Sequence, residues 1–226
     1  MIALVTGASR GIGRATAIAL AKRGLDVALW SRDAKQLQWV AEEVAQVGVQ
    51  ASVHACDVSL GNDVDRAYAE VVAKLGTPTI VVNNAGVVLR AAAHETDELD
   101  WDRVIAVNLK GTFLVSRICL PHLRAQKQGR IIQVGSISST VGTACGTAYN
   151  ASKWGVLGFT KSLAEELRGT GVQTMCVLPG SVDTDMLRGS GYEAQMTADD
   201  VARTIVYAAL DAPDAMNGSA IEIFGS

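Results

Sequence analysis

The segment Thr6-Gly7-Ala8-Ser9-Arg10-Gly11-Ile12-Gly13 follows a short apolar run, Ile2–Thr6, and opens a helical pattern that extends to about Arg23. Glycine lets the backbone turn tightly and approach a bound group closely. The helix that follows offers N–H groups and the positive end of its dipole to an anion. Any tight turn favours glycine, so the turn is weak evidence by itself. Three glycines at a strand–helix junction nevertheless favour nucleotide binding, and no Gly-Lys-Ser/Thr follows to make a Walker loop.

The alternation of strand and helix patterns continues to the end of the chain. Further strands are predicted at 26–30, 50–55, 79–82, 130–134, 172–178 and 220–224, and helices at about 33–47, 59–75, 99–124, 147–168 and 197–210. This order predicts βαβ units and a doubly wound parallel sheet with helices on both faces. Pro121 is expected to kink or split its helix, and Trp154 is expected to pack in the core. A chain of 226 residues fits one domain, residues 1–226.

Composition excludes several classes of function. The net charge is −3, with 20 Lys and Arg against 23 Asp and Glu, so there is no basic excess for nucleic acid. We expect no membrane span, because no apolar run approaches about 18–20 residues, and no secretory signal. The cysteines lie far apart, which argues against a metal site and disulfides and fits a cytoplasmic protein; they are Cys56, Cys119, Cys145 and Cys176.

The residues after the second predicted strand indicate which nucleotide binds. An acidic residue there suits the ribose 2′-hydroxyl of NAD, whereas an arginine suits the 2′-phosphate of NADP. That strand ends in Ser31-Arg32, and Arg10 in the glycine-rich turn is a second cation near the same ribose. Guanidinium groups match phosphate with paired hydrogen bonds. The two arginines favour NADP(H), and Asp33, one residue late for the NAD role, is the evidence against it.

Tyr149 and Lys153 are spaced i, i+4 on one face of a predicted helix. A free tyrosine is a poor acid–base group at neutral pH, and a neighbouring ammonium favours its phenolate form. An isolated pair of this kind is more often an exposed helical pair. Ser136, 13 residues earlier and directly after a strand, could bond a substrate oxygen in the same crevice; Ser138 and Ser139 are alternatives to it.

With these pieces in place, the sequence resembles the short-chain dehydrogenase/reductase family over essentially its whole length. Each matching motif is modest alone, but seven in the family's order and spacing are highly specific. They are Thr6–Gly13, Cys56-Asp57-Val58, Asn83-Asn84-Ala85-Gly86, Val107-Asn108, Ser136, Tyr149-Asn150-Ala151-Ser152-Lys153 and Pro179-Gly180-Ser181-Val182-Asp183-Thr184.

The resemblance implies a Rossmann fold with seven strands in the order 3-2-1-4-5-6-7. It also implies a catalytic set: Tyr149 as general acid–base, Ser136 on the substrate oxygen, Lys153 on the nicotinamide ribose, and Asn108 holding a water of the proton relay. The cofactor-binding residues it implies are Gly7, Ser9, Arg10, Gly11, Ile12, Gly13, Ser31, Arg32, Asp57, Val58, Asn84, Ala85, Gly86, Tyr149, Lys153, Pro179, Gly180, Val182 and Thr184.

The substrate side is less defined. The segment at about 185–197 is shorter than the lid that relatives usually carry, which suggests an open pocket. We expect Ser138, Cys145, Met186 and Leu187 to line it, and no metal to bind.

The predicted function is NADPH-dependent, reversible reduction of a ketone or aldehyde to an alcohol. One alternative is a 3-oxoacyl-thioester reductase acting on ACP or CoA substrates, for which Arg90, Arg117, Arg124 and Arg130 could supply a basic docking patch. The other is a non-catalytic NADP(H) sensor, which would not require the full catalytic set. The resemblance also implies a homo-oligomer, a dimer or tetramer, with a small-molecule substrate as the other partner.

Overall fold

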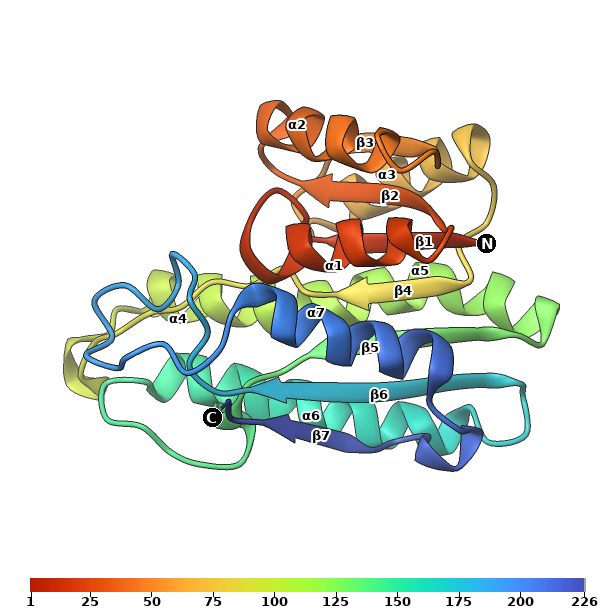
Figure 1. Ribbon diagram of the computed structural model, residues 1–226. Coiled ribbons are helices and arrows are strands. Elements are labelled where there is room, and N and C mark those ends of the chain that lie inside the picture. The colour runs from red at the N-terminus through yellow and green to blue at the C-terminus, as the bar shows by residue number, and fades with distance from the viewer. Residues whose placement is uncertain (226) are drawn as a thin grey trace.

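The computed structural model describes residues 1–225, and one sheet of seven parallel strands runs through them (Figure 1). The strand order is β3-β2-β1-β4-β5-β6-β7, which confirms the predicted Rossmann topology. The order reverses between β1 and β4, and such a reversal opens a crevice at the carboxyl ends of the strands. The strands are β1 (Ile2–Thr6), β2 (Asp26–Ser31), β3 (Ala51–Ala55), β4 (Ile80–Asn83), β5 (Gly129–Val134), β6 (Val172–Pro179) and β7 (Ala220–Ile223).

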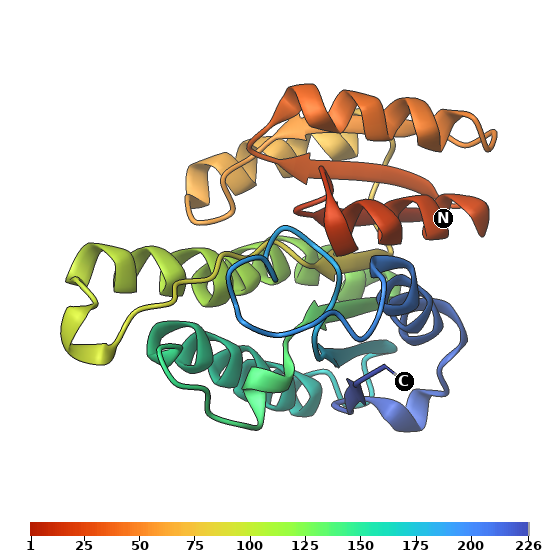
Figure 2. The same ribbon diagram turned by 60° about the vertical axis from the view of Figure 1, so that its left-hand side comes forward.

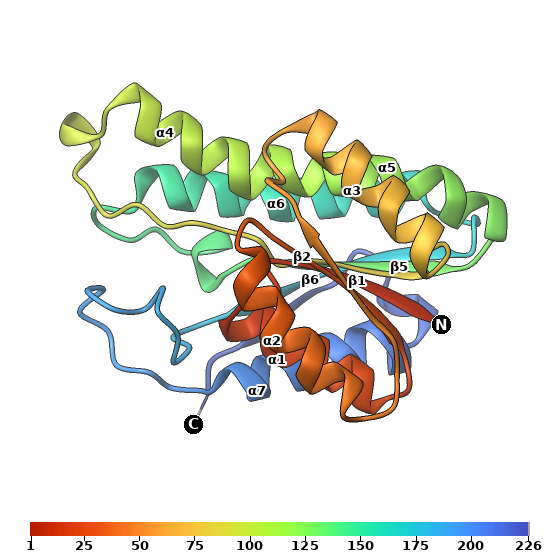
Figure 3. The same ribbon diagram turned by 90° about the horizontal axis from the view of Figure 1, so that it is seen from above.

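Helices cover both faces of the sheet, as the view from above shows (Figure 3). One layer holds α1 (Gly11–Lys22), α2 (Ala34–Ala45) and α7 (Ala198–Val206). The other holds α3 (Gly61–Lys74), α4 (Glu98–Ile105), α5 (Gly111–Gln126) and α6 (Thr147–Glu166). Shorter turns are η1 (Ala93–Glu95), η2 (Ala106–Lys110), η3 (Ile137–Ser139), η4 (Tyr207–Asp211) and η5 (Asp214–Met216), of which η2 and η4 are π-helical.

The core lies in two layers separated by the sheet. Successive side chains of a strand point to opposite faces. Along β1, Ala3 and Val5 pack with the α1, α2 and α7 layer, while Leu4 packs with the α3, α5 and α6 layer. Both faces are therefore apolar, which explains why the strands read as nearly continuous apolar runs in the sequence.

The fourth predicted helix is interrupted, but not at Pro121. Helix α5 continues through Pro121, and α-helical bonding is broken instead at the π turn η2, which carries Asn108. Pro121 is exposed, so the carbonyl that loses its backbone N–H partner faces water and the disruption is small. Trp154 is also placed differently from the prediction, since 52% of it is exposed on the outer face of α6.

The helical stretch Glu98–Gln126, which joins α4, η2 and α5, is long and apolar enough by composition to cross a membrane, with a mean hydropathy of 1.4 over its best 18-residue window. This differs from the expectation that no such segment exists. Its side chains Leu114, Val115 and Cys119 pack against the sheet. The apolar positions on that face raise the mean hydropathy of the stretch, as in a core helix.

The loops that follow the strands gather at one end of the sheet. Figure 2 shows the segment between β6 and α7 looping across this end, beside the start of α1 and the C-terminal part of β5. The C-terminal strand finishes nearby, where the Gly180 N–H bonds the Ile223 carbonyl at 2.8 Å. Residues far apart in the sequence are therefore brought to the crevice predicted from the strand order.

Candidate active site

The glycine-rich turn is built for close packing. Gly7 has φ +65°, and a Cβ on it would lie 2.9 Å from the Ala85 Cα. A Cβ on Gly13 would lie 2.2 Å from the Gly7 carbonyl oxygen. No side chain caps the start of α1, and its first turn holds no acidic residue. The N–H groups at this helix end are thus left for an anion, as the sequence predicts.

Asn84 and Thr6 tie the turn to the end of β4. The Asn84 side-chain amide donates to the Thr6 carbonyl at 2.9 Å and the Gly7 carbonyl at 3.2 Å. In return, the Thr6 hydroxyl accepts the N–H groups of Asn84 and Ala85, both at 3.0 Å. These bonds hold the loops after β1 and β4 together at the point where the strand order reverses.

A cleft of about 790 Å³ runs along the carboxyl ends of β1 to β4. Thirteen of the predicted cofactor residues line it: Gly7, Ser9, Arg10, Gly11, Ile12, Ser31, Arg32, Asp57, Val58, Asn84, Ala85, Gly86 and Thr184. The other six lie outside its lining: Gly13 packs beneath the turn, Tyr149 and Lys153 lie on α6, Pro179 ends β6, and Gly180 and Val182 lie in the loop that follows β6.

Four arginines and four aspartates line the cleft: Arg10, Arg32, Arg103, Arg188, Asp33, Asp57, Asp183 and Asp185. Arg10 and Arg32 both line the cleft and are exposed. Asp33, the counter-evidence in the sequence, also lines the cleft, and one oxygen of its carboxylate, Oδ1, caps α2 by accepting the Gln36 N–H at 3.0 Å. Arg10, Arg32 and Asp33 thus lie in the same cleft, as their order in the sequence predicts.

Two further arginines and an aspartate in the cleft were missed by sequence reasoning. Asp185 pairs with Arg10 at 3.2 Å and with Arg188 at 3.0 Å. Arg103 also lines the cleft. The spacing i, i+4 between Arg103 and Val107 of a matched motif could have flagged it, whereas nothing in the sequence marks Arg188 or its contact with Asp185.

Lys153 is the most unusual charged group near the cleft, because it is only 5% exposed and has no carboxylate partner among residues 1–225. Its Nζ donates to the Val134 carbonyl at 2.8 Å and lies 5.7 Å from the centre of the Tyr149 ring. An ammonium has three donors, so two remain for other oxygens. A Cβ on Gly86 would lie 3.8 Å from this Nζ and 3.4 Å from Asn108 Oδ1. The small residue therefore keeps the space between the cleft and these two side chains open.

Asn108 is fixed by the loop after β4. Its Oδ1 accepts the Val87 N–H at 2.8 Å, and its Nδ2 donates to the Val87 carbonyl and to the Ser152 hydroxyl, both at 2.9 Å. The side-chain amide has no donor left, and only one lone pair of Oδ1 stays open beside Lys153. The π turn brings Asn108 to this place, and nothing in the helical pattern of the sequence predicted that turn.

Ser136 follows β5, as predicted, in front of η3, which packs on α6. Its hydroxyl oxygen accepts the Ser138 N–H at 3.1 Å, which leaves the hydroxyl hydrogen free to be donated. Ser139 is fully buried and its hydroxyl accepts the Ser136 N–H at 3.4 Å. The hydroxyl of Ser139 is therefore part of a capping box, and of these two residues Ser136 is the better donor to a substrate oxygen.

The four residues expected on the substrate side are dispersed. Met186 lines the cleft, while Leu187 lies half-buried in the following turn. Ser138 is buried beneath Ser136. Cys145 is exposed with φ +56°, and its carbonyl accepts the Ala91 N–H at 3.0 Å. Among these four, only Met186 belongs to the cleft lining.

The arginines considered for an acyl-carrier patch do not form one. Arg90, in the loop after β4, contacts the segment that follows β6, because its side chain donates to the Met186 carbonyl at 2.7 Å. Arg117 and Arg124 line a separate groove of about 470 Å³ between α5 and α6. Arg130 is the second residue of β5, at the opposite end of the sheet, and donates to the Ala208 carbonyl at 2.9 Å. Arg90 is thus the one of the four beside the cleft.

A glycine-rich turn beside a reversal of strand order defines a dinucleotide-binding class of α/β fold. Within that class, the chain belongs to the short-chain dehydrogenase family, because residues 1–194 match the sequence pattern of that family. The family and the homologues below support an oxidoreductase.

Relatives match nearly the whole chain. It is 35% identical over 224 residues to an uncharacterized oxidoreductase of Staphylococcus epidermidis, covering 98% of this chain and 96% of that one. It is 34% identical over 236 residues to 3-oxoacyl-acyl-carrier-protein reductase FabG of the same species, covering 99% and 97%.

Solved structures agree with this placement. A 3-ketoacyl-ACP reductase from Sinorhizobium meliloti 1021 superposes with a TM-score of 0.94 at 32% identity, covering 100% of this chain and 98% of that one. A metagenomic short-chain oxidoreductase in complex with NADP gives a TM-score of 0.88 at 36% identity, covering 100% and 97%.

Proposed function

We propose that the protein is an NADPH-dependent oxidoreductase that reduces a ketone or aldehyde to an alcohol, reversibly, with Tyr149 as the general acid–base. The observation that carries this proposal is the buried ammonium of Lys153. It lies 5.7 Å from the centre of the Tyr149 ring and borders Gly86, and two of its donors are left for a ligand. Burying an unpaired cation is unfavourable, so a site that keeps one has a use for it.

Each residue around the crevice has its own role in the proposed reaction. Bound nicotinamide supplies the hydride in reduction and accepts it in oxidation. The Ser136 hydroxyl holds the substrate oxygen, and the Tyr149 hydroxyl donates its proton there as negative charge develops. The Lys153 ammonium stabilises the phenolate that remains and holds the nicotinamide ribose. Asn108, through the open lone pair of Oδ1, holds a water that returns a proton by way of Lys153.

Cofactor selection follows from charge at the adenosine end. Arg10 and Arg32 line the cleft there, and Asp33 is held as a helix cap. A guanidinium binds a phosphate far better than it binds a neutral ribose hydroxyl. The NADP complex of the metagenomic relative supports the same choice. The residues that would hold the nicotinamide end are Pro179, Gly180, Val182 and Thr184.

Two alternative functions are supported or opposed by different kinds of evidence. The names of the FabG relatives favour a 3-oxoacyl-thioester reductase, whereas the dispersed arginines Arg117, Arg124 and Arg130 give it no docking patch at the cleft. A non-catalytic NADP(H) sensor would need neither Ser136 nor the buried Lys153. The carbonyl reductase therefore stays the primary proposal.

The test is NADPH oxidation, followed by nicotinamide absorbance, with three sets of substrates: simple ketones and aldehydes, 3-oxoacyl thioesters of CoA, and the same acyl groups on an acyl carrier. Turnover of the first set supports the proposal. Turnover restricted to carrier-bound substrates supports the thioester reductase. Tight NADPH binding without turnover of any set would identify a sensor.

We also propose a homo-oligomer formed through α5 and α6. The groove between them is lined by Phe113, Phe159 and Leu163, with Arg124 and Glu166 at its sides, and a two-fold axis would set the arginine of one copy against the glutamate of the other. Phe113→Asp is expected to lower the mass measured by light scattering. For location we propose the cytoplasm, supported by the free state of the four cysteines.

A further inference from the structure

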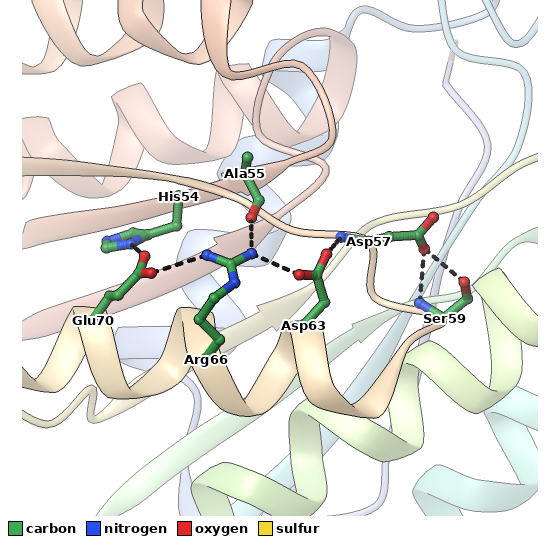
Figure 4. Close-up of polar contacts among 7 residues, drawn as sticks. All are labelled: His54, Ala55, Asp57, Ser59, Asp63, Arg66 and Glu70. Carbon is green, nitrogen blue, oxygen red and sulfur yellow. Dashed lines mark hydrogen bonds and ion pairs between the residues drawn. The ribbon is translucent and has the colours of Figure 1, made fainter.

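A network of charged side chains joins the edge strand β3 to α3 and reaches the cleft (Figure 4). Arg66 is its centre: it bonds the Asp63 carboxylate at 2.7 Å and the Glu70 carboxylate at 2.9 Å, one turn on either side along α3. Glu70 in turn bonds His54 Nδ1 at 2.9 Å. These residues belong to none of the family motifs that the sequence displays, and no step of the proposed chemistry uses them.

The far end of the network is anchored in the sheet. His54 is 4% exposed, and its second ring nitrogen lies 2.9 Å from the Ser52 hydroxyl. The ring is therefore held on both sides, and Glu70 is fixed against it. Hydrogen bonds from His54 and then Arg66 keep the pKa of Glu70 below its usual range, so the acceptor stays charged at neutral pH.

The near end holds the loop that leaves β3 for the cleft. Arg66 donates to the Ala55 carbonyl at 2.7 Å, and Asp63 accepts the Asp57 N–H at 2.9 Å. Two side chains of α3 thus fix the backbone of this loop on both sides of Cys56. Asp57 and Val58, which follow directly, line the cleft.

The carboxylate of Asp57 is itself oriented. One oxygen, Oδ1, accepts both the N–H of Ser59 at 3.0 Å and its hydroxyl at 2.7 Å. The other oxygen points away from Ser59 in Figure 4 and has no hydrogen-bond partner among residues 1–225. A charged oxygen that borders the cleft without a partner is suited to accept a hydrogen bond from a ligand amino group.

We propose that Arg66 and Asp63 are positioning residues for the cofactor's adenine: they hold the loop so that the free oxygen of Asp57 accepts the hydrogen bond of the adenine 6-amino group. This inference rests on the proposed function. A purely structural role would make Arg66 matter equally for every dinucleotide. The positioning role makes it matter for those that carry the amino group.

The experiment compares dissociation constants of NADPH and of its deamino analogue, in which hypoxanthine replaces adenine, by fluorescence titration. Arg66→Gln is expected to raise the Kd of NADPH about tenfold and that of the deamino analogue less than twofold, with kcat unchanged. Arg23→Gln is the matched control. Arg23 has the same exposed fraction as Arg66, 47%, and binds Asp211 through two nitrogens at 2.9 Å.

Asp63→Asn provides an independent test if Arg66→Gln folds poorly, and a double variant tests the coupling to Asp57. Asp63→Asn keeps an oxygen for the Asp57 N–H but loses the ion pair with Arg66, and it should show a smaller effect with the same bias toward NADPH. In an Asp57→Ala background, Arg66→Gln should change neither constant, as expected for residues that act through one another.

Equal weakening of both dinucleotides, or no weakening of either, would overturn the positioning role while leaving the proposed function intact. If the unaltered protein bound neither dinucleotide, the proposed function would fall together with this inference.

Discussion

The loops after β1, β3 and β4 are held by side chains that bond backbone groups, whereas the loops at 140–146 and 184–196 consist mostly of exposed residues. In these exposed loops, Asn150 donates to the Val141 carbonyl and Arg90 donates to the Met186 carbonyl. Asn84 and Asp63 each fix a turn of the first group. In the second group Val141 and Tyr192 are exposed apolar residues, and the Arg10–Asp185 pair is accessible to water. The dinucleotide side is thus fixed by internal hydrogen bonds, and the substrate side is more open to water.

This difference explains why the residues support a specific cofactor but only a broad class of substrates, ketones and aldehydes. Dinucleotide binding depends on backbone geometry and fixed charges, which glycines and arginines reveal. Of the residues expected on the substrate side, Cys145, Met186 and Leu187 lie in the two exposed loops, and among these three only Met186 lines the cleft.

Replacing Lys153 removes the buried charge on the dinucleotide side of the site. Lys153→Met should lower kcat/KM about a thousandfold, because the phenolate loses its counter-charge and the ribose loses a donor. Lys161→Met, on an exposed position of the same helix, is the control and should stay near the parent value. Activity of Lys153→Met within threefold of the parent would remove the buried ammonium from the mechanism.

Reversing the charge at Arg32 tests the choice of cofactor. Arg32→Asp should reduce the preference for NADPH over NADH by about ten- to a hundredfold, since hydrogen bonds between charged groups contribute about 1.5–3 kcal/mol. Steady-state kinetics with both cofactors measure the ratio. Arg168→Asp, at an exposed pair with Glu165, should leave it unchanged. An unaltered ratio for Arg32→Asp would refute the 2′-phosphate assignment.

A matched pair of glycines compares the two regions directly. Gly13→Ala would place a Cβ 2.2 Å from a carbonyl oxygen, whereas Gly142→Ala, in the substrate-side loop, meets nothing within 4 Å. Gly13→Ala should lower the free energy of unfolding by about 1–3 kcal/mol, as overpacking does, and Gly142→Ala should change it little. Urea unfolding measures both. Equal effects would contradict the contrast between the regions.

The smallest effect is expected at the exposed pair between the two regions. Asp185→Asn frees Arg10 for the cofactor and should lower the Kd of NADPH about two- to threefold, because exposed ion pairs contribute little. The Kd of NADH should not change. Asp214→Asn, at the opposite end of the sheet, serves as control. Weaker NADPH binding by Asp185→Asn would show that the pair supports the site instead of competing with it.

The sequence predicted the fold well because its signals are local or carried by family resemblance. Short apolar runs that alternate with helical patterns marked the strands. The resemblance to the family, carried by the matched motifs, implied the strand order. Helix ends and caps follow from short-range chemistry, although Asp33 was weighed as a cofactor ligand before its role as a cap was visible. The π turn at Ala106–Lys110 was missed, because one extra residue in a helical turn leaves no mark in an apolar pattern.

Contacts between segments that are distant in the sequence were also not predicted. The pairing of Arg10 with Asp185 joins residues 175 positions apart, and the network around Arg66 depends on how α3 packs beside β3. Trp154 was expected in the core because it is large and apolar, yet it faces outward on α6. Hydrophobicity alone does not tell which face of a helix meets the sheet.

The central claim is that Tyr149 exchanges a proton with the substrate beside a bound nicotinamide. The most direct measurement is kcat and the Kd of NADPH for Tyr149→Phe, with Tyr207→Phe, an exposed tyrosine, as the control. The account predicts that kcat falls about a thousandfold while the Kd stays within twofold of the parent. Turnover by Tyr149→Phe at the parent rate would contradict it.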